Sequence, residues 1–164
     1  MSRDARRSEF YATERLIFAM LDRAGGGAHT VQIAGATLTV PAEARFGALT
    51  DVQRYVERVL ALGAVRAEFP RAMVPVSVRR RRSGRAAHYT RAYAEIAVPD
   101  DADGRWALRE LVVLHELAHH LYDGDGPAHG PGYAHVLIDL VGLVLGPEVG
   151  LVYRVLLADA GLLA

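Results

Sequence analysis

Apolar residues that recur every three or four positions predict two helices in the N-terminal part of the chain. The first spans about residues 3–23, where charged residues separate the apolar ones, and the glycines at 25–27 end it. The second runs to about residue 62, with Thr50-Asp51 offering its N-cap and Gly63 as its stop. Both patterns are typical of helices that bury one face.

Short β segments are predicted at two places. Residues 30–40 contain two of them, around Ala34-Gly35. Residues 74–78 and 93–98 are β-like as well, and Ser83-Gly84 between them indicates a turn. The sequence therefore predicts a hairpin that carries several arginines, namely Arg79, Arg80, Arg81, Arg82, Arg85 and Arg91.

Three more helices are predicted in the C-terminal part. A break at residues 99–104 precedes the strongest helical pattern, from about residue 105 to 122, and a loop rich in Gly, Pro and Asp follows at 123–130. Helices that reach about residues 145 and 162 then begin at prolines, which suit the first turn of a helix. Strands early and helices late in the chain indicate an α+β fold.

Length and composition favour one packed domain over residues 1–164. Hydrophobic residues make up 51% of the chain and charged residues 23%, which excludes general disorder. Within this domain we expect the N-terminal helices and short strands in 1–70, the sheet and functional core in 74–145, and a C-terminal helix in 147–164.

Charge and missing residue types exclude several classes of protein. The 19 basic residues, all Arg, balance 19 acidic ones, so net charge gives no reason to expect a nucleic-acid or membrane-surface protein. The absence of Cys excludes disulfide scaffolds, Fe–S clusters and cysteine nucleophiles, and the absence of Lys excludes Schiff-base chemistry. No secretory leader or membrane-spanning segment is evident, so we expect a cytoplasmic protein.

The candidate chemistry lies in the strongest helix, where residues 115–119 match the pattern HExxH. Positions four apart lie on one face of a helix, so the imidazoles of His115 and His119 can bind one Zn²⁺. Glu116 is turned away from that row, and its carboxylate can take a proton from a water on the metal. The flanking residues are apolar, where an unpaired glutamate would be unfavourable. We therefore interpret the histidines as metal ligands and Glu116 as a general base.

A catalytic zinc commonly has three protein ligands and one position open to water. Several residues after His119 could supply the third ligand: His120, Asp123, Asp125, His129, His135 and Glu148. His120 is rotated about 100° from His119 and is expected to face elsewhere. Asp123 continues the ligand row, but Gly124 indicates that the helix ends there. His129 follows a flexible turn that can fold the chain back toward the metal.

The segment His129-Gly130-Pro131-Gly132-Tyr133 resembles the HGPxF segment that follows HExxH in SprT-like (Spartan-type) zinc metalloproteases, which belong to the minigluzincin superfamily. The resemblance covers about residues 74–145, and the chain is also similar to small actinobacterial families of metallohydrolases. In the proteases the histidine of this segment is the third zinc ligand, which implies that role for His129. Tyr133 takes the place of the family's Phe.

The resemblance also implies a fold and an activity. The expected fold is a minigluzincin-like zincin, with a small, mainly antiparallel sheet packed on the HExxH helix and flanking helices. Residues 94–99 resemble the strand that precedes this helix, which in the family commonly lies at the sheet edge and pairs with extended substrate. The implied activity is zinc-dependent cleavage of peptide bonds, with a peptide or protein substrate and Glu116 passing its proton to the leaving amine.

Other polar residues have both functional and ordinary explanations. A Tyr, an Arg or His135 could stabilise the oxyanion, and Tyr122 is a candidate that could equally be a core tyrosine. His135 and Asp139 form either an outer-shell pair that orients a ligand or an exposed i,i+4 pair. The arginines 79–82 either bind phosphate or acidic peptides, or form a solvated arm that protects a sheet edge. We interpret three remaining residues as structural, with the last packing as an anchor: His29, His88 and Trp106.

Three functions therefore compete. The first is a zinc-dependent peptidase or related amide hydrolase. The second is a nucleic-acid-associated protein that binds phosphate through the Arg79–Arg91 hairpin, and the third is a metal-stabilised interaction module without catalysis. We favour the first, because a purely structural site would not need Glu116 and usually closes its fourth position with a protein ligand.

Overall fold

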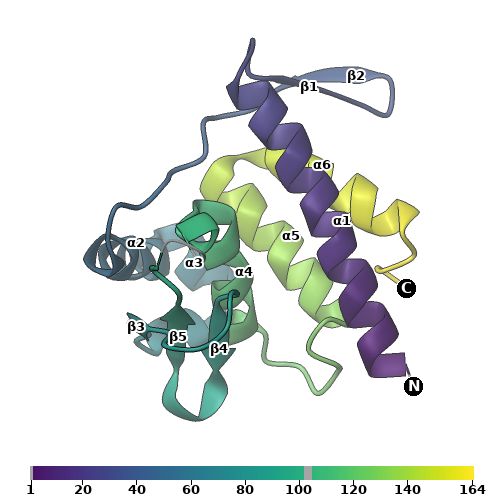
Figure 1. Cartoon of the computed structure of the whole chain (residues 1–164). Coiled ribbons are helices and arrows are strands. Elements are labelled where there is room, and N and C mark those ends of the chain that lie inside the picture. Colours follow the sequence, from purple (N-terminus) through teal and green to yellow (C-terminus); the bar gives the residue numbers. More distant parts are fainter. Residues whose placement is uncertain (1, 102–104) are drawn as a thin grey trace. The chain divides into compact units, whose positions relative to one another are not determined.

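The computed structural model describes residues 2–101 and 105–164, so part of the predicted break, residues 102–104, lies outside the described residues. The described residues form α-helices and two small sheets (Figure 1), which confirms the predicted α+β class. They group into two compact units. One contains the residues up to Glu43 together with Gly124–Ala164, and the other contains Ala44–Asp123.

The first unit combines long helices with a two-stranded antiparallel sheet. Its described elements lie where the spacing of apolar residues predicts them: α1 (Ser2–Gly25), β1 (Thr30–Ile33), β2 (Ala36–Thr39), α5 (Pro131–Leu145) and α6 (Pro147–Asp159). In this unit α5 packs along α6, and α1 contacts both α6 and β1. Within the described chain, no helix is both long and apolar enough to cross a bilayer.

Unusual backbone conformations form the tight connections of this unit. Ala34 and Gly35 between β1 and β2 have φ values of 47° and 78°. Positive φ at both central residues gives a turn whose twist matches that of antiparallel strands. Gly146, between α5 and α6, has a φ of 107°, a conformation that favours glycine. Pro147 then begins α6 directly.

The second unit contains the HExxH helix and a three-stranded sheet. In chain order its helical elements are α2 (Leu49–Ala61), α3 (Gly63–Glu68), η1 (Pro70–Met73), η2 (Arg91–Tyr93), η3 (Arg105–Ala107) and α4 (Glu110–Leu121). Its strands are β3 (Ser77–Arg80), β4 (His88–Thr90) and β5 (Glu95–Val98). α4 contacts β4, η1 and α2, and α2 contacts β3.

The predicted hairpin between residues 74 and 98 is wrong. β3 and β5 are neighbours, but they run parallel, with Ser77 opposite Glu95 and Arg80 opposite Val98. Parallel neighbours cannot be joined by a tight turn and need a crossover. The crossover contains β4, a strand that the sequence did not predict, which pairs antiparallel with β5. Gly84, with a φ of 90°, lies in the loop before β4 rather than at a hairpin turn.

The expected sheet-edge position of residues 94–99 is wrong for the same reason. The strand order is β3-β5-β4, so β5 is the central strand and the edges are β3 and β4. Ile96, Ala97 and Val98 are all buried, the continuous pattern of a strand covered on both faces. The sheet of this unit is mixed rather than mainly antiparallel.

The helix boundaries of this unit also differ from prediction. α2 begins after Ala48, without a side-chain cap from Thr50 or Asp51. α2 ends at Ala61, close to the predicted end, but the break is formed by the extended backbone of Leu62, and Gly63 begins α3. α4 begins at Glu110, later than predicted. Trp106 lies before this helix and is 49% exposed, so it is not the buried anchor that was expected.

α5 and α6 of the first unit pack closely at two glycines, Gly142 and Gly150. A Cβ added to Gly150 would lie 3.1 Å from Cα of Gly142 and 3.5 Å from its backbone nitrogen. Both are backbone atoms of a packed helix and cannot swing aside. The two glycines therefore let the helix backbones approach more closely than side chains would allow.

We predict that Gly150→Ala lowers the free energy of unfolding by about 1–3 kcal/mol, because the added methyl group overpacks this crossing. Urea unfolding followed by circular dichroism measures the change. Gly63→Ala is the matched control, because a Cβ there meets nothing within 4 Å. Since alanine favours helix over glycine, the control should be neutral or slightly more stable. Equal stability of Gly150→Ala and wild type would contradict the close packing.

Candidate metal centre

His115 and His119 form the centre of the candidate site in the second unit. They lie one turn apart on α4, and their Nε2 atoms are 3.2 Å apart. The rings are inclined at 71°, with centroids 5.0 Å apart. His115 is only 3% exposed, whereas His119 is partly buried. The spacing predicted from HExxH is confirmed.

The geometry of this pair fits a shared metal ion. Two imidazole nitrogens at about 2.0–2.1 Å from one tetrahedral ion lie about 3.3–3.4 Å from each other. The observed separation of 3.2 Å is close to this value. At this distance one ring can donate to the other through Nε2–H, and when neither Nε2 carries a hydrogen both can present a lone pair to a cation.

Glu116 follows His115 on α4 and is 5% exposed. The helix places its carboxylate about 100° around the axis from His115, beside the ligand row rather than on it. Its helix neighbours Leu114 and Leu117 are completely buried. A carboxylate in such surroundings is stable only where it has polar or cationic partners, which is the environment that a metal-activated water would provide.

His129 belongs to the first unit, in the loop before α5. Three aromatic rings of that unit surround it, with centroids 5.4 Å away at Phe10, 5.1 Å at Tyr11 and 5.4 Å at Tyr133. Tyr133 is completely buried and fills the core position that the resemblance assigned to Phe. The contacts from α1 could not be predicted, because Phe10 and Tyr11 carry no motif that links them to His129.

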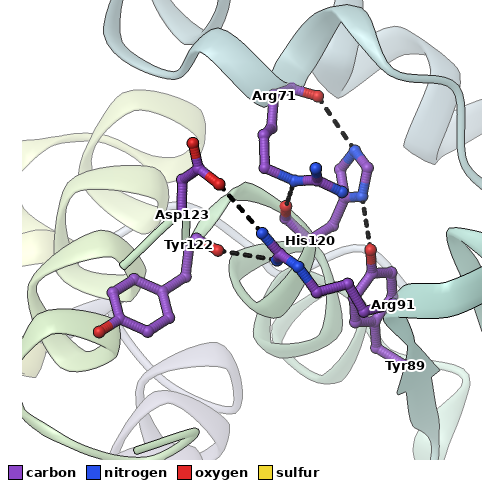
Figure 2. Close-up of polar contacts among 6 residues, drawn as sticks. All are labelled: Arg71, Tyr89, Arg91, His120, Tyr122 and Asp123. Carbon is purple, nitrogen blue, oxygen red and sulfur yellow. Dashed lines mark hydrogen bonds and ion pairs between the residues drawn. The ribbon is translucent and has the colours of Figure 1, made fainter. Parts of the chain in front are cut away.

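His120 faces away from the candidate ligands, as predicted, and has a complete set of protein partners (Figure 2). Its ring is completely buried, with Nδ1 2.8 Å from the Tyr89 hydroxyl. Nε2 lies 3.1 Å from the carbonyl oxygen of Arg71 and 3.0 Å from that of Val74. Carbonyl oxygens only accept, so Nε2 carries the hydrogen, and in the neutral ring Nδ1 accepts from Tyr89.

Burial keeps this ring neutral. Desolvation lowers the pKa of His120 below its ordinary value, because the imidazolium loses hydration in the interior. The positive charges of Arg71 and Arg91 lower the pKa further, while hydrogen bonds to the carbonyls of Val74 and Arg71 oppose the shift. His120 is thus a neutral structural histidine rather than a ligand.

The end of α4 explains why Asp123 is not among the ligands. Arg91 donates to the carbonyl of Tyr122 at 2.9 Å and pairs with the Asp123 carboxylate at 3.0 Å (Figure 2). The helix ends at Leu121, so Asp123 no longer continues the ligand row. The ring of Tyr122 points away from Arg91 and His120 in Figure 2, and its role as an oxyanion donor stays a prediction.

The remaining ligand candidates lie in the first unit and are not part of the histidine group. Asp125 and His135 are exposed, and Glu148 is half-buried. Asp139 pairs with Arg154 at 3.8 Å instead of forming the predicted pair with His135. The reason is that α5 and α6 pack together, which brings an arginine of α6 near Asp139.

Glu110 is a buried polar residue that the sequence interpretation missed. One carboxylate oxygen accepts from the Ala44 amide at 2.9 Å, and the other accepts a short hydrogen bond from the Tyr55 hydroxyl. The Glu110 amide donates to the carbonyl of Ala44 at 3.0 Å. A charged residue at the start of an otherwise apolar helix could have drawn attention to Glu110. Its partners could not be predicted, because they lie far away in sequence.

Two arginines of the predicted arm are paired with carboxylates. Arg79 pairs with Glu95 at 2.5 Å, and Arg80 pairs with Asp100 at 2.7 Å. Arg81 donates to the carbonyl of Ala86 within the loop before β4. Local pairing leaves less positive charge for phosphate than the run of four arginines suggests, and nucleic-acid binding stays a prediction of the sequence.

His88 lies on β4, a strand that was not predicted, and His29 lies between α1 and β1. His88 begins β4 opposite Ala97. His29 has a φ of 56°, its amide donates to Ala24 at 3.0 Å, and its carbonyl accepts from Val40 at 2.8 Å. Both positions agree with the structural interpretation of these residues.

No protein-family model, curated protein or solved structure matches the chain, so the interpretation depends on the residues themselves. Two of the predicted ligands share one face of α4 beside the predicted base, and the third lies in an aromatic cradle of the first unit. The polar contacts that hold the two ends of α4, through Tyr55 and Tyr89, were not predicted.

We predict that Tyr55→Phe lowers the free energy of unfolding by about 1–3 kcal/mol, because the buried Glu110 carboxylate loses a hydrogen-bond donor. Chemical unfolding of the purified variants measures the change. Tyr93→Phe is the control, since Tyr93 is 76% exposed and its hydroxyl remains hydrated. If the two variants were equally stable, the Tyr55–Glu110 contact would contribute nothing.

Proposed function

We propose that the chain is a zinc-dependent hydrolase that cleaves peptide bonds, with His115, His119 and His129 as metal ligands and Glu116 as the general base. One observation carries the proposal: the Nε2 atoms of two histidines on one buried helix lie 3.2 Å apart, next to a buried glutamate. In zinc hydrolases, two histidines four residues apart on a helix bind the metal, and the glutamate after the first histidine acts as the base.

The donor set of the proposed centre consists of three imidazoles. His115 and His119 supply two facing ring nitrogens on α4, and we infer that His129 supplies the third. Imidazole suits Zn²⁺ as well as other transition metals, so the donor set favours a transition metal over Mg²⁺ or Ca²⁺. Three protein ligands leave one position for water, which distinguishes a catalytic site from a closed structural one.

The residues of the chain have distinct roles in the proposed reaction. When bound, Zn²⁺ supplies an acidified water and positive charge for a carbonyl oxygen. Glu116 accepts a proton at its carboxylate and passes it to the leaving amine. The buried helix around Glu116 limits access of bulk water, so the proton moves between the carboxylate and the reacting groups. Tyr122, at the end of α4, is the candidate donor to the oxyanion.

The resemblance to SprT-like zinc metalloproteases supports the same function. It rests on the HExxH residues and on the His129-Gly130-Pro131 segment with Tyr133. We propose a minigluzincin-like fold on this basis. A metal-stabilised module without catalysis is the alternative, and it differs in one respect: Glu116 would then have no chemical role.

We predict that the purified protein binds about one Zn²⁺ per chain, measured by elemental mass spectrometry after dialysis against buffer with trace zinc. His119→Ala should lose stoichiometric zinc, because one of the paired donors is gone. His135→Ala is the matched control, since this histidine is exposed and lies outside the proposed centre. Absence of zinc from wild type, or its full retention in His119→Ala, would contradict the proposal.

We predict that Glu116→Gln keeps its zinc but loses at least about 10²-fold in turnover, because the ligands remain while the base is absent. The assay is mass-spectrometric detection of new peptide termini after incubation of a mixed peptide library with zinc-loaded protein at neutral pH. His29→Ala should retain wild-type cleavage, because His29 is exposed and has no proposed role in the reaction. Zinc-loaded wild type that produced no more new termini than Glu116→Gln would support the non-catalytic module instead.

A further inference from the structure

The last turn of α4, which carries His119, is held by hydrogen bonds to other elements of the second unit. We call the residues involved the clamp, defined as His120 on α4 together with Tyr89, Arg71 and Arg91 (Figure 2). Tyr89 lies on β4, Arg71 on η1 and Arg91 on η2. Three separate elements of the second unit therefore converge on one helix end.

Part of the clamp caps the helix. The last carbonyls of an α-helix have no partner within the helix. Arg71 donates from Nε to the carbonyl of His120 at 2.7 Å, and Arg91 donates to that of Tyr122 at 2.9 Å. The residue after α4 is Tyr122, with φ −70° and ψ 116°, so no left-handed glycine cap is formed there. The two guanidinium groups take its place.

The other part of the clamp fixes the rotation of the helix about its own axis. The His120 ring has contacts at both nitrogens, with Tyr89 on one side and the carbonyls of Arg71 and Val74 on the other. A ring held at both ends cannot turn without breaking hydrogen bonds in a buried site. Because His119 and His120 are adjacent on one helical turn, fixing the side of the helix from which His120 projects also fixes the side from which His119 projects.

Packing alone would not need this network. A buried apolar side chain in place of His120 would fill the space without the desolvation of polar groups, and buried polar networks characteristically select one arrangement among several of similar packing. The arrangement selected here leaves Nε2 of His119 3.2 Å from Nε2 of His115.

We propose that Tyr89 and His120 are positioning residues of the metal centre, which hold the last turn of α4 so that His119 faces the ion. This inference rests on the proposed function, since it concerns the same ion. Neither residue is a ligand, and each acts through the direction of the His119 ring.

The experiment compares the zinc affinity of Tyr89→Phe with that of Tyr55→Phe, by competition with a chromophoric chelator at neutral pH. Both variants remove one buried tyrosine hydroxyl that contacts α4, Tyr89 at the His120 end and Tyr55 at the Glu110 end. We expect Tyr89→Phe to weaken zinc binding about 10-fold, the lower end of the range for outer-shell partners. Tyr55→Phe should remain within about twofold of wild type, because its end of the helix holds no ligand.

The visible spectrum of Co²⁺-substituted protein provides a second readout. Tyr89→Phe should change the ligand-field bands, because His119 becomes less ordered, whereas Tyr55→Phe should reproduce the wild-type bands. His120→Gln, whose amide can still donate toward the carbonyls of Arg71 and Val74, should bind zinc more tightly than His120→Leu.

Equal zinc affinity in Tyr89→Phe and wild type would overturn the inference. So would an equal loss in Tyr55→Phe, because the effect would then follow stability rather than position. These results would leave wild-type zinc binding intact, and with it the proposed function. A wild-type protein without zinc would overturn both.

Discussion

Burial of polar side chains along one apolar helix is the constraint on which the rest of the structure depends. Apart from His119, every residue of α4 is buried, and four of these buried residues are polar: Glu110, His115, Glu116 and His120. A buried polar group without partners is unfavourable by about 1–3 kcal/mol or more. Each of these polar groups on α4 therefore needs a hydrogen-bonding or metal partner.

The buried polar residues of α4 include structural residues and candidate metal ligands. Glu110 and His120 are matched by protein groups, a tyrosine hydroxyl and backbone atoms in each case. They fasten the two ends of the helix. His115 faces the imidazole of His119, with the two Nε2 atoms 3.2 Å apart. That separation also suits two nitrogens that bind one tetrahedral metal ion.

Local signals in the sequence were enough to predict part of this arrangement. The helical period located α1, α5 and α6, and the HExxH spacing placed two imidazoles on one face, because both depend only on the geometry of a helix. The turn at Ala34-Gly35 was predicted for a similar reason, since a tight turn is specified by its own residues.

The contacts that were missed join residues far apart in sequence. β3 pairs with β5 rather than with a strand next to it along the chain, and a strand of three residues, β4, has too little sequence to give a pattern. The contacts of Tyr55 with Glu110 and of Tyr89 with His120 span 55 and 31 residues. Trp106 was misjudged because size and apolarity favour burial only where the backbone directs the side chain inward.

The central claim is that imidazoles on α4 and in the loop before α5 bind one zinc ion. X-ray absorption at the zinc edge of the loaded protein tests it most directly, because imidazole ligands give a characteristic multiple-scattering signal. The account predicts three nitrogen ligands of imidazole type and one oxygen ligand, all at about 2.0–2.1 Å. A shell of six oxygen atoms without imidazole scattering would contradict it.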